Sequence, residues 1–334
     1  MSDLLTVATA PKWARDLLAS EIVPADGDRS AVWRIAQDTS TATISDQFKA
    51  DADGYHARYA ASGHFLVLFR QALAASGVSV ADSPLVLDLG SGSGVNSIVP
   101  CLELFPGARQ VATDLSYELL AILADYAEHA GFADRVLPVV MDAMSDHVAP
   151  RRFDLVTGAS ILHHLVHPRR GLQVAARALK PGGHAIFLEP FEGYGLMRLA
   201  YQRILAEAEL RRDPLAAPVE RTLRAMAIDI AARTAPDPAA PHFAHLDDKW
   251  LFSREQFEAM ARESGFAQVR FVPHNDHPTL YRDAAAVQIR LSTGDASLAL
   301  PPWALAILDE FDAAIPPSAK RLFMLEGTVV LTRG

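Results

Sequence analysis

One short stretch limits what this chain can fold into: the sequence LVLDLGSGSG at residues 85–94. Its first half is apolar apart from Asp88, which is typical of a buried parallel strand. Glycines follow at alternate positions, Gly90, Gly92 and Gly94, and a helix-compatible run begins directly after them. Glycine accepts positive φ angles and lets the backbone approach a ligand without a Cβ in the way. A strand, a glycine-rich turn and a helix together predict a nucleotide-binding α/β sheet.

The residues after this turn alternate between strand patterns and helix patterns. The strand patterns cover 109–113, 135–140, 153–157, 184–188, 268–272 and 328–331. The helix patterns cover 116–130, 168–179 and 253–264. Ser116 and Gly131 are suited to begin and end the first of these helices. Such alternation predicts a parallel sheet with right-handed crossovers.

Three regions lack this alternation. Residues 1–80 show no strand pattern and predict helices near 11–20, 29–37 and 45–76, whereas 191–250 and 274–320 are helical insertions within the sheet. Both insertions leave the sheet at the carboxyl ends of strands, where α/β sheets bind ligands, so we expect them to cover a pocket. The predicted division is an N-terminal helical lid and packing region (1–80), a nucleotide-binding core (81–190), a helical cap insertion (191–250), more core (251–273), a second helical insertion (274–320) and a final core strand (321–334).

Composition narrows the class of protein. The net charge is −9, which disfavours a nucleic-acid partner, because such proteins usually present a basic face. The single cysteine, Cys101, allows no disulfide within the chain and fits a reducing compartment. No signal peptide and no apolar run of membrane-spanning length are recognised, so we expect a cytoplasmic protein that does not associate with a membrane.

The glycine spacing and the acidic residues at strand ends bear on the cofactor. The turn has the spacing G-x-G-x-G, with Val95 where the dinucleotide fingerprint places its third glycine, so an NAD-dependent oxidoreductase is disfavoured. No P-loop lysine is present, which argues against ATP hydrolysis. Asp114 ends the second strand and can accept hydrogen bonds from both ribose hydroxyls. Asp142 ends the third strand and can accept from an adenine amino group.

Five segments carry a family resemblance: LVLDLGSGSG (85–94), VATDLS (111–116), VVMDAM (139–144), FDLVTGASILHHLVHP (153–168) and LKPGGHAIFLEP (179–190). In their order and spacing they resemble the class I S-adenosylmethionine (SAM)-dependent methyltransferases, in particular the ubiquinone/menaquinone and small-molecule enzymes. The resemblance implies a Rossmann-like sheet of seven mostly parallel strands with an antiparallel last strand. It implies SAM as cofactor and S-adenosylhomocysteine as product.

The resemblance also implies a set of cofactor contacts. The turn backbone would lie along the methionine part of SAM, with Asp88 near its amino group and Asp114 at the ribose. Leu115, Asp142 and Ala143 would contact the adenine, and the backbone of Ser160 would approach the amine. Tyr55 and Tyr59 would form a lid over the cofactor. The implied cofactor-binding residues are Asp88, Gly90, Ser91, Gly92, Gly94, Asp114, Leu115, Asp142, Ala143, Ser160, Tyr55 and Tyr59. Each has a structural alternative: Asp114 could start a helix, Asp142 could cap a turn, and the tyrosines could pack in the core.

Three further residues are candidates for the chemistry. His163 follows the fourth strand and, as a neutral imidazole, could deprotonate or orient the acceptor, a role we weigh evenly against a structural one. His164 lies beside it, and Glu189 ends the fifth strand, where it could orient the acceptor or pair with a cap residue. His163, His164 and His167 resemble a metal cluster only in part, since no H-E-x-x-H glutamate accompanies them, so no metal is expected.

The predicted function is methyl transfer from SAM to a small or medium organic acceptor, with oxygen favoured. A natural product or the carboxylate of a modified peptide would fit the elaborate cover, and carbon and nitrogen acceptors stay open. One rival is an RNA or protein methyltransferase, although GASIL stands where an Asn-Pro-Pro-Tyr motif would lie. Another is a non-catalytic SAM-binding partner subunit. Whether the chain forms a homodimer stays open.

Overall fold

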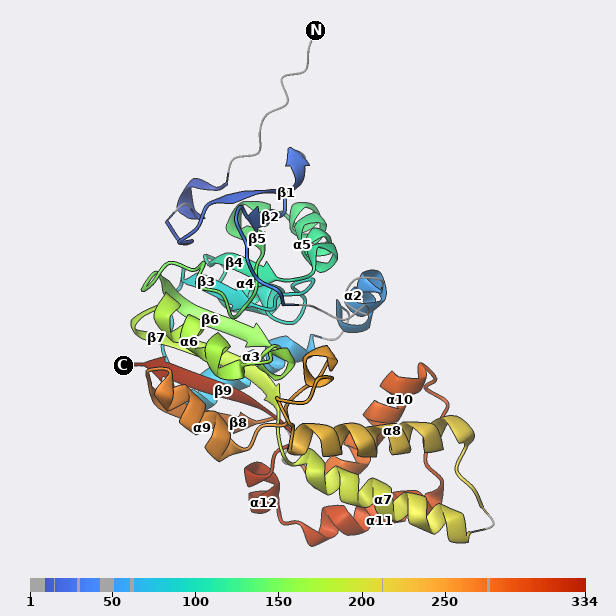
Figure 1. Ribbon diagram of the computed structural model, residues 1–334. Helices are drawn as coiled ribbons and strands as arrows, with labels where there is room; N and C mark the ends of the chain where they lie inside the picture. The colour runs from blue at the N-terminus through green and yellow to red at the C-terminus, as the bar shows by residue number, and fades with distance from the viewer. Residues whose placement is uncertain are drawn as a thin grey trace.

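The computed structural model describes residues 10–14, 16–28, 31–42, 51–60, 63–211, 213–274 and 277–334. These residues form one large sheet with helices on both faces and a separate group of helices next to it (Figure 1). In order across the sheet, the nine strands are β1 (Ile22–Asp28), β2 (Trp33–Ile35), β5 (Val136–Val140), β4 (Arg109–Asp114), β3 (Leu85–Leu89), β6 (Phe153–Ala159), β7 (Leu179–Pro190), β9 (Glu326–Arg333) and β8 (Phe266–Pro273).

The predicted seven-stranded Rossmann-like core is present in this sheet, from β5 to β8. β3 lies between β4 and β6 and is parallel to both. The last strand, β9, pairs antiparallel with β7 and with β8, which confirms the predicted antiparallel strand. Since the chain leaves β3 first to one side and later returns to the other, the glycine turn after β3 lies at the switch point where such sheets bind ligands.

Two further strands correct the expectation for the N-terminal region. β2 replaces a helix predicted over 29–37 and pairs parallel with β5, and β1 pairs antiparallel with β2. Trp33 and Ile35 are buried on either side of the exposed Arg34, which is the alternation of a strand, but three residues are too few to reveal it. Of the helix expected at 11–20, the described residues 11–14 and 16–20 contain only the 3-10 turn η1 (Lys12–Ala14).

The helix expected at 45–76 is divided. α2 (Ala52–Ala60) and α3 (His64–Ser76) are separate helices, and Gly63 precedes α3 with a φ of 55°. The part of that prediction at 45–50 and 61–62 lies outside the described residues. No helix among the described residues is both long and apolar enough to cross a membrane.

Helices cover both faces of the sheet. α3, α4 (Ile98–Leu104) and α5 (Tyr117–Ala130) pack on one face, and α6 (Pro168–Ala178) and α9 (Arg254–Glu263) pack on the other. The predicted ends of α5 are confirmed: Ser116 Oγ accepts a hydrogen bond from the Leu119 amide at 3.1 Å, and Gly131 ends the helix with a φ of 74°. The short 3-10 turn η2 (Ala133–Arg135) leads into β5.

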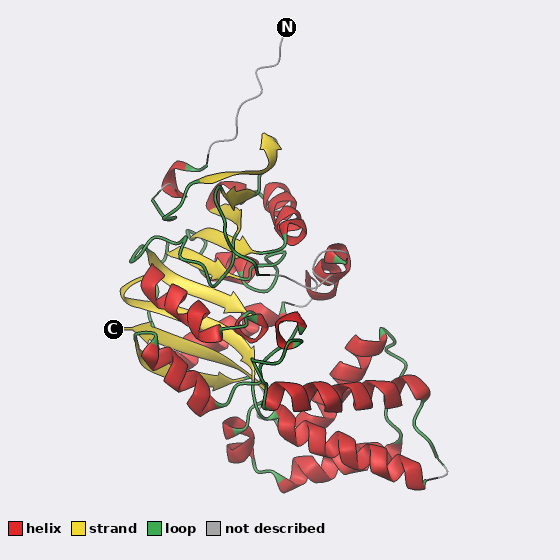
Figure 2. Cartoon of the chain, in the orientation of Figure 1, coloured by secondary structure: helices red, strands yellow, loops and turns green. Residues whose placement is uncertain are grey.

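The two insertions form a helical cap with its own core. α7 (Tyr194–Leu210), α8 (Ala217–Thr234), α10 (Leu280–Thr293) and α11 (Pro302–Ala314) pack against one another around buried Tyr201, Tyr281 and Leu308 (Figure 2). This confirms the helices predicted in both insertions. α12 (Pro317–Leu322) adds the buried Lys320, whose Nζ donates to Asp312 Oδ1 at 2.7 Å. The 3-10 turn η4 (Phe243–His245) precedes the segment that returns to the sheet.

Candidate active site

The three glycines of the turn after β3 have different surroundings, although all have positive φ angles, between 51° and 80°. A Cβ on Gly90 would lie 2.5 Å from Ile161 Cδ1, and one on Gly94 would lie 2.5 Å from Leu123 Cδ1. A Cβ on Gly92 would meet nothing nearer than Tyr55 Cε1, at 3.7 Å. Two glycines are therefore closed in by packing, and the backbone of Gly92 is the part of the turn that a ligand can approach.

Asp114 lies directly against this open glycine. Its Oδ2 accepts a hydrogen bond from the Gly92 amide at 2.8 Å, and its Oδ1 accepts from the Ser116 amide at 2.8 Å. Burial raises the pKa of Asp114, and these backbone donors act against that shift. Nearby, Ser93 Oγ and Asn96 Oδ1 are buried and have no hydrogen-bond partner among the described residues. A carboxylate and unpaired polar atoms around an open glycine fit a ligand that carries hydroxyl and amino groups.

Asp88 lies beneath the turn and is fully buried. Its Oδ2 accepts from Ser97 Oγ at 2.7 Å and its Oδ1 from Thr157 Oγ1 at 2.5 Å. Burial raises its pKa to about 6, and the hydrogen bonds from neutral hydroxyls offset that shift only in part. Asp88 therefore joins β3, β6 and the start of α4, and its side chain is not exposed beside the cofactor position expected for it.

The predicted adenine-side residues lie at the ends of β4 and β5. Asp142 Oδ1 accepts from the Met144 amide at 2.8 Å, and Oδ2 accepts from Ser40 Oγ at 2.8 Å. Leu115 is half-buried, whereas Ser91 and Ala143 are buried.

The remaining predicted cofactor contacts come from β6 and α2. Ser160 has a φ of 61° and donates its amide to the Leu188 carbonyl at 2.9 Å, so this amide is already bonded within the sheet. Tyr55 and Tyr59 stack with their ring centroids 5.0 Å apart, and Asn96 Nδ2 donates to the Tyr55 hydroxyl at 3.3 Å. Tyr55 thus lies beside Gly92, and Tyr59 packs on Tyr55.

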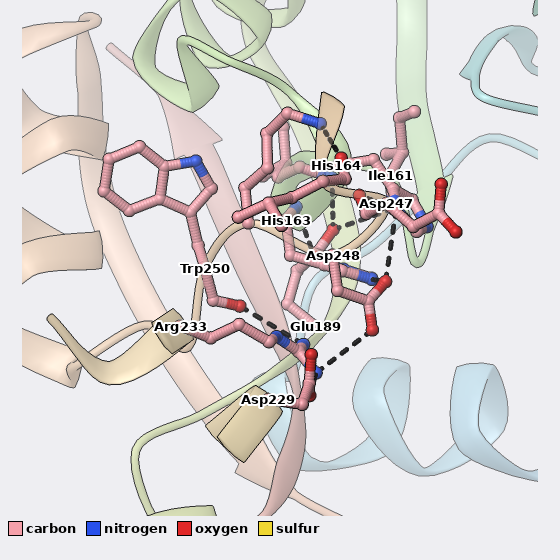
Figure 3. A network of polar contacts seen from close by, with 12 residues as sticks. Ile161, His163, His164, Glu189, Asp229, Arg233, Asp247, Asp248 and Trp250 are labelled. Carbon is pink, nitrogen blue, oxygen red and sulfur yellow. Dashed lines mark hydrogen bonds and ion pairs between the residues drawn. The ribbon is translucent and has the colours of Figure 1, made fainter. Parts of the chain in front are cut away.

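Glu189 organises the turn that carries the two histidines, η3 (Leu162–His164). Its carboxylate is buried and accepts from the backbone amides of η3: Oε1 takes the Leu162 amide at 2.8 Å. Oε1 also accepts from the Ile161 amide, and Oε2 accepts from the His163 amide, both at 3.2 Å. Oε2 further accepts from His163 Nδ1 at 2.7 Å (Figure 3). Glu189 therefore orients both the turn and the imidazole.

A second carboxylate, Asp248, meets the histidines from the cap. Its Oδ1 lies 3.3 Å from His163 Nε2 and 3.3 Å from His164 Nδ1. Its Oδ2 lies 3.0 Å from an Arg233 guanidinium nitrogen of α8, and Arg233 also pairs with Asp229 at 3.1 Å (Figure 3). Sequence reasoning missed Asp248 and Arg233, because both belong to an insertion without a recognised motif and reach the histidines only through the fold.

The two histidines differ in charge: His163 is protonated and His164 is neutral. Burial alone would lower the pKa of His163, but the carboxylates of Glu189 and Asp248 outweigh burial and raise that pKa to about 9. Burial and the neighbouring His163 lower the pKa of His164 to about 3. At neutral pH His163 therefore keeps its proton and His164 is neutral. For His163 to act as a base, it would first have to lose the proton shared with Asp248.

Comparisons with known proteins match the region that holds the turn and the histidines. Residues 87–185 match the family model described as a methyltransferase domain. A ubiquinone biosynthesis O-methyltransferase of Cronobacter sakazakii is 34% identical over 104 residues, which cover 30% of this chain and 40% of that protein. A release factor glutamine methyltransferase of Chlorobaculum tepidum is 45% identical over 73 residues, which cover 22% of this chain and 24% of that protein.

The matches to these two relatives thus cover less than half of either protein's length. Among solved structures, the methyltransferase determined in complex with the Haloferax volcanii Trm112 methyltransferase activator has the same fold, with a TM-score of 0.50, 16% identity, and coverage of 87% of this chain and 99% of that one. This chain shares the fold of that methyltransferase, with its glycine turn at the switch point of the sheet. Over residues 87–185 this chain is thus similar to known methyltransferase domains.

Proposed function

We propose that this protein transfers a methyl group from SAM to a small or medium organic acceptor, with S-adenosylhomocysteine as the second product. The observation that carries the proposal is the open backbone of Gly92 with the Asp114 carboxylate hydrogen-bonded against it. In this proposal Asp114 exchanges its bond to the Gly92 amide for the ribose hydroxyls, and the turn backbone lies along the methionine part. SAM supplies the reactive group, a methyl on a positively charged sulfur.

The acceptor side of the proposal rests on η3 and the cap. Methyl transfer from a sulfonium requires mainly alignment of the acceptor and exclusion of water. The return segment of the cap, which carries Asp248, contacts His163 and His164 beside Ile161, and Ile161 itself packs on Gly90. This continuity between the glycine turn, η3 and the cap supports an acceptor held between them. We favour oxygen as the methylated atom, in line with the O-methyltransferase relative.

The test begins with donor binding and proceeds to transfer. Isothermal titration of the full chain with SAM and with S-adenosylhomocysteine is expected to show one site. Asp114→Asn is expected to weaken it at least tenfold, because the ribose loses a charged acceptor worth about 1.5–3 kcal/mol. Asp125→Asn, an exposed residue of α5, is the matched control. Transfer of a labelled methyl group is then measured on a panel of hydroxylated, amine and carbon acceptors. Absence of SAM binding would overturn the proposal.

A further inference from the structure

Three potential metal ligands converge where the cap meets the sheet. His163 Nε2, His164 Nδ1 and a carboxylate oxygen of Asp248 all lie within 4.8 Å of one another. The two histidines come from η3, whereas Asp248 comes from the segment that returns from the cap (Figure 3). The sequence alone shows no such set, because Asp248 joins the two histidines only in the folded chain.

The spacing of these atoms fits a tetrahedral ion. Asp248 Oδ1 lies 3.3 Å from His163 Nε2 and 3.3 Å from His164 Nδ1. With metal–ligand bonds of about 2.0–2.2 Å, neighbouring ligands of a tetrahedral site lie ~3.4 Å apart. These two separations therefore suit a bound ion, around which the imidazole rings of His163 and His164 would adjust.

Hydrogen bonding around His163 prepares its Nε2 to bind a cation. Glu189 Oε2 lies 2.7 Å from Nδ1 and accepts the proton there, which directs Nε2 toward Asp248. A carboxylate that orients a histidine in this way is typical of metal centres, where it fixes the tautomer and raises the basicity of the ligand. Because the Nε2 lone pair and the Asp248 carboxylate face each other at 3.3 Å, a cation, either a proton or a metal ion, must lie between them.

The local charge also favours a divalent ion. Three carboxylates meet at this junction, those of Glu189, Asp229 and Asp248, and the guanidinium of Arg233 is the cation that pairs with two of them. Arg233 binds Asp248 Oδ2 and so leaves Oδ1 directed at the histidines. Two negative charges remain for an ion to balance. One bond must change: His164 Nδ1 now donates to the Asp247 carbonyl at 2.9 Å, and as a ligand it would carry its proton on Nε2 instead.

We propose that His163, His164 and Asp248 bind one divalent transition-metal ion of the zinc type, with Glu189 as the residue that positions His163. Two imidazoles and one carboxylate suit such an ion, and three protein ligands leave a position open. The ion joins the cap to the carboxyl end of the sheet. If the proposed methyl transfer is correct, the open position takes an oxygen of the acceptor and lowers its pKa, a role that rests on the proposed function.

The test uses the full chain, stripped of metal with a chelator and titrated with Zn²⁺ by calorimetry. One equivalent is expected to bind, and Co²⁺ is expected to give the visible absorption of a tetrahedral nitrogen and oxygen site. Asp248→Asn and His163→Gln are each expected to weaken Zn²⁺ binding at least 100-fold. Glu189→Gln should weaken it 10- to 100-fold, the range for a residue that acts through a ligand. His167→Gln is the control, since it removes a neighbouring imidazole outside the cluster.

Each outcome decides for or against the site. The proposal is overturned if the native protein binds no Zn²⁺. It is also overturned if His163→Gln and Asp248→Asn bind Zn²⁺ as tightly as the control His167→Gln. Circular dichroism checks that each variant is folded, and Zn²⁺ should raise the melting temperature of the native protein but not that of Asp248→Asn. SAM binding is measured on the same samples: SAM binding without Zn²⁺ binding defeats the metal site alone, and Zn²⁺ binding without SAM binding defeats the proposed function alone.

Discussion

The two halves of the candidate site bury charge in different ways. On the turn side, defined by Asp88, the glycine turn and Asp114, the buried carboxylate of Asp88 has only hydroxyl partners, and its pKa rises to about 6. On the histidine side, defined by η3, Glu189 and Asp248, the buried imidazole has two carboxylate partners, and its pKa rises to about 9. Burial favours the neutral form of both groups. Only on the histidine side does an opposite charge within hydrogen-bonding distance outweigh the effect of burial.

The largest effect is expected from Glu189→Ala on the histidine side. This change removes the acceptor of the η3 amides and leaves the His163 imidazolium without its closest counter-charge. Breaking a buried pair by deleting one partner costs about 3–5 kcal/mol. Urea unfolding at pH 7 measures this loss.

The control for Glu189→Ala is Glu263→Gln, which breaks the exposed pair between Glu263 and Arg169. Exposed pairs of this kind contribute about 0–1 kcal/mol, so the control should change little. If Glu189→Ala cost no more than the control, the His163–Glu189 pair would not stabilise the fold.

The pH dependence of stability should separate the two sides in the metal-free protein. Asp88 and His163 both have folded-state pKa values above their unfolded values, so each stabilises the fold at low pH and loses that contribution as pH rises. The loss falls between about pH 4 and 6 for Asp88 and between about pH 6.5 and 9 for His163, and amounts to ~3 kcal/mol for each. Urea unfolding across pH 4–9 with a chelator present measures both losses.

Variants assign each part of that profile to its side. The Asp88→Asn variant should lack the loss of stability that the native protein shows between about pH 4 and 6, and should keep the loss at alkaline pH. The His163→Gln variant should lack the alkaline loss and keep the acidic one. The comparison uses native minus variant stability at each pH, so that other titrating groups cancel. A variant that flattened both parts of the profile would show that the two clusters are coupled and that the division into two sides is wrong.

The two sides also differ in how much of each could be predicted from the sequence. The turn side lies within one strand–turn–helix unit and the next strand end, so local patterns revealed Asp88, Gly92 and Asp114, and β3 has the predicted bounds. The seven core strands were also predictable, because most of them alternate with helix patterns, and the cap helices were predictable because their patterns are long. β2 was missed because Trp33–Ile35 is too short to show alternation.

Only some residues of the histidine side could be predicted from the sequence. His163 follows the core strand β6 and Glu189 lies near the end of β7, and strand ends are visible in the sequence. Asp248 and Arg233 come from the first insertion, and no local pattern indicates that α8 and the returning segment place them against η3. The packing of the cap decides this contact, and with it the charge of His163.

A moderate effect is expected from Asp88→Asn at neutral pH. With a pKa raised to about 6, ionised Asp88 at pH 7 has lost ~3 kcal/mol of stability relative to its neutral form, and an uncharged amide escapes that loss. The amide NH2 cannot accept from one of the two hydroxyls, which costs about 1–3 kcal/mol, so Asp88→Asn should leave the stability unchanged or raise it by up to about 2 kcal/mol. Asp88→Ala should cost more, because it leaves Ser97 and Thr157 as buried hydroxyls without their acceptor. The measurement is urea unfolding at pH 7. Equal costs for the two variants would mean that the hydroxyl pairs contribute nothing.

The smallest effect on stability, and the sharpest on ligand binding, is expected at Gly92. Gly90→Ala places a Cβ 2.5 Å from Ile161 in addition to straining a positive φ, so it should destabilise the fold by about 3 kcal/mol or more. Gly92→Ala meets no close neighbour and should cost only the ~1 kcal/mol of its backbone conformation. Calorimetry should nevertheless show that Gly92→Ala loses SAM binding, because the new methyl group occupies the surface that the cofactor would approach. If Gly92→Ala bound SAM as well as the native protein, the open face of the turn would not be where the cofactor lies.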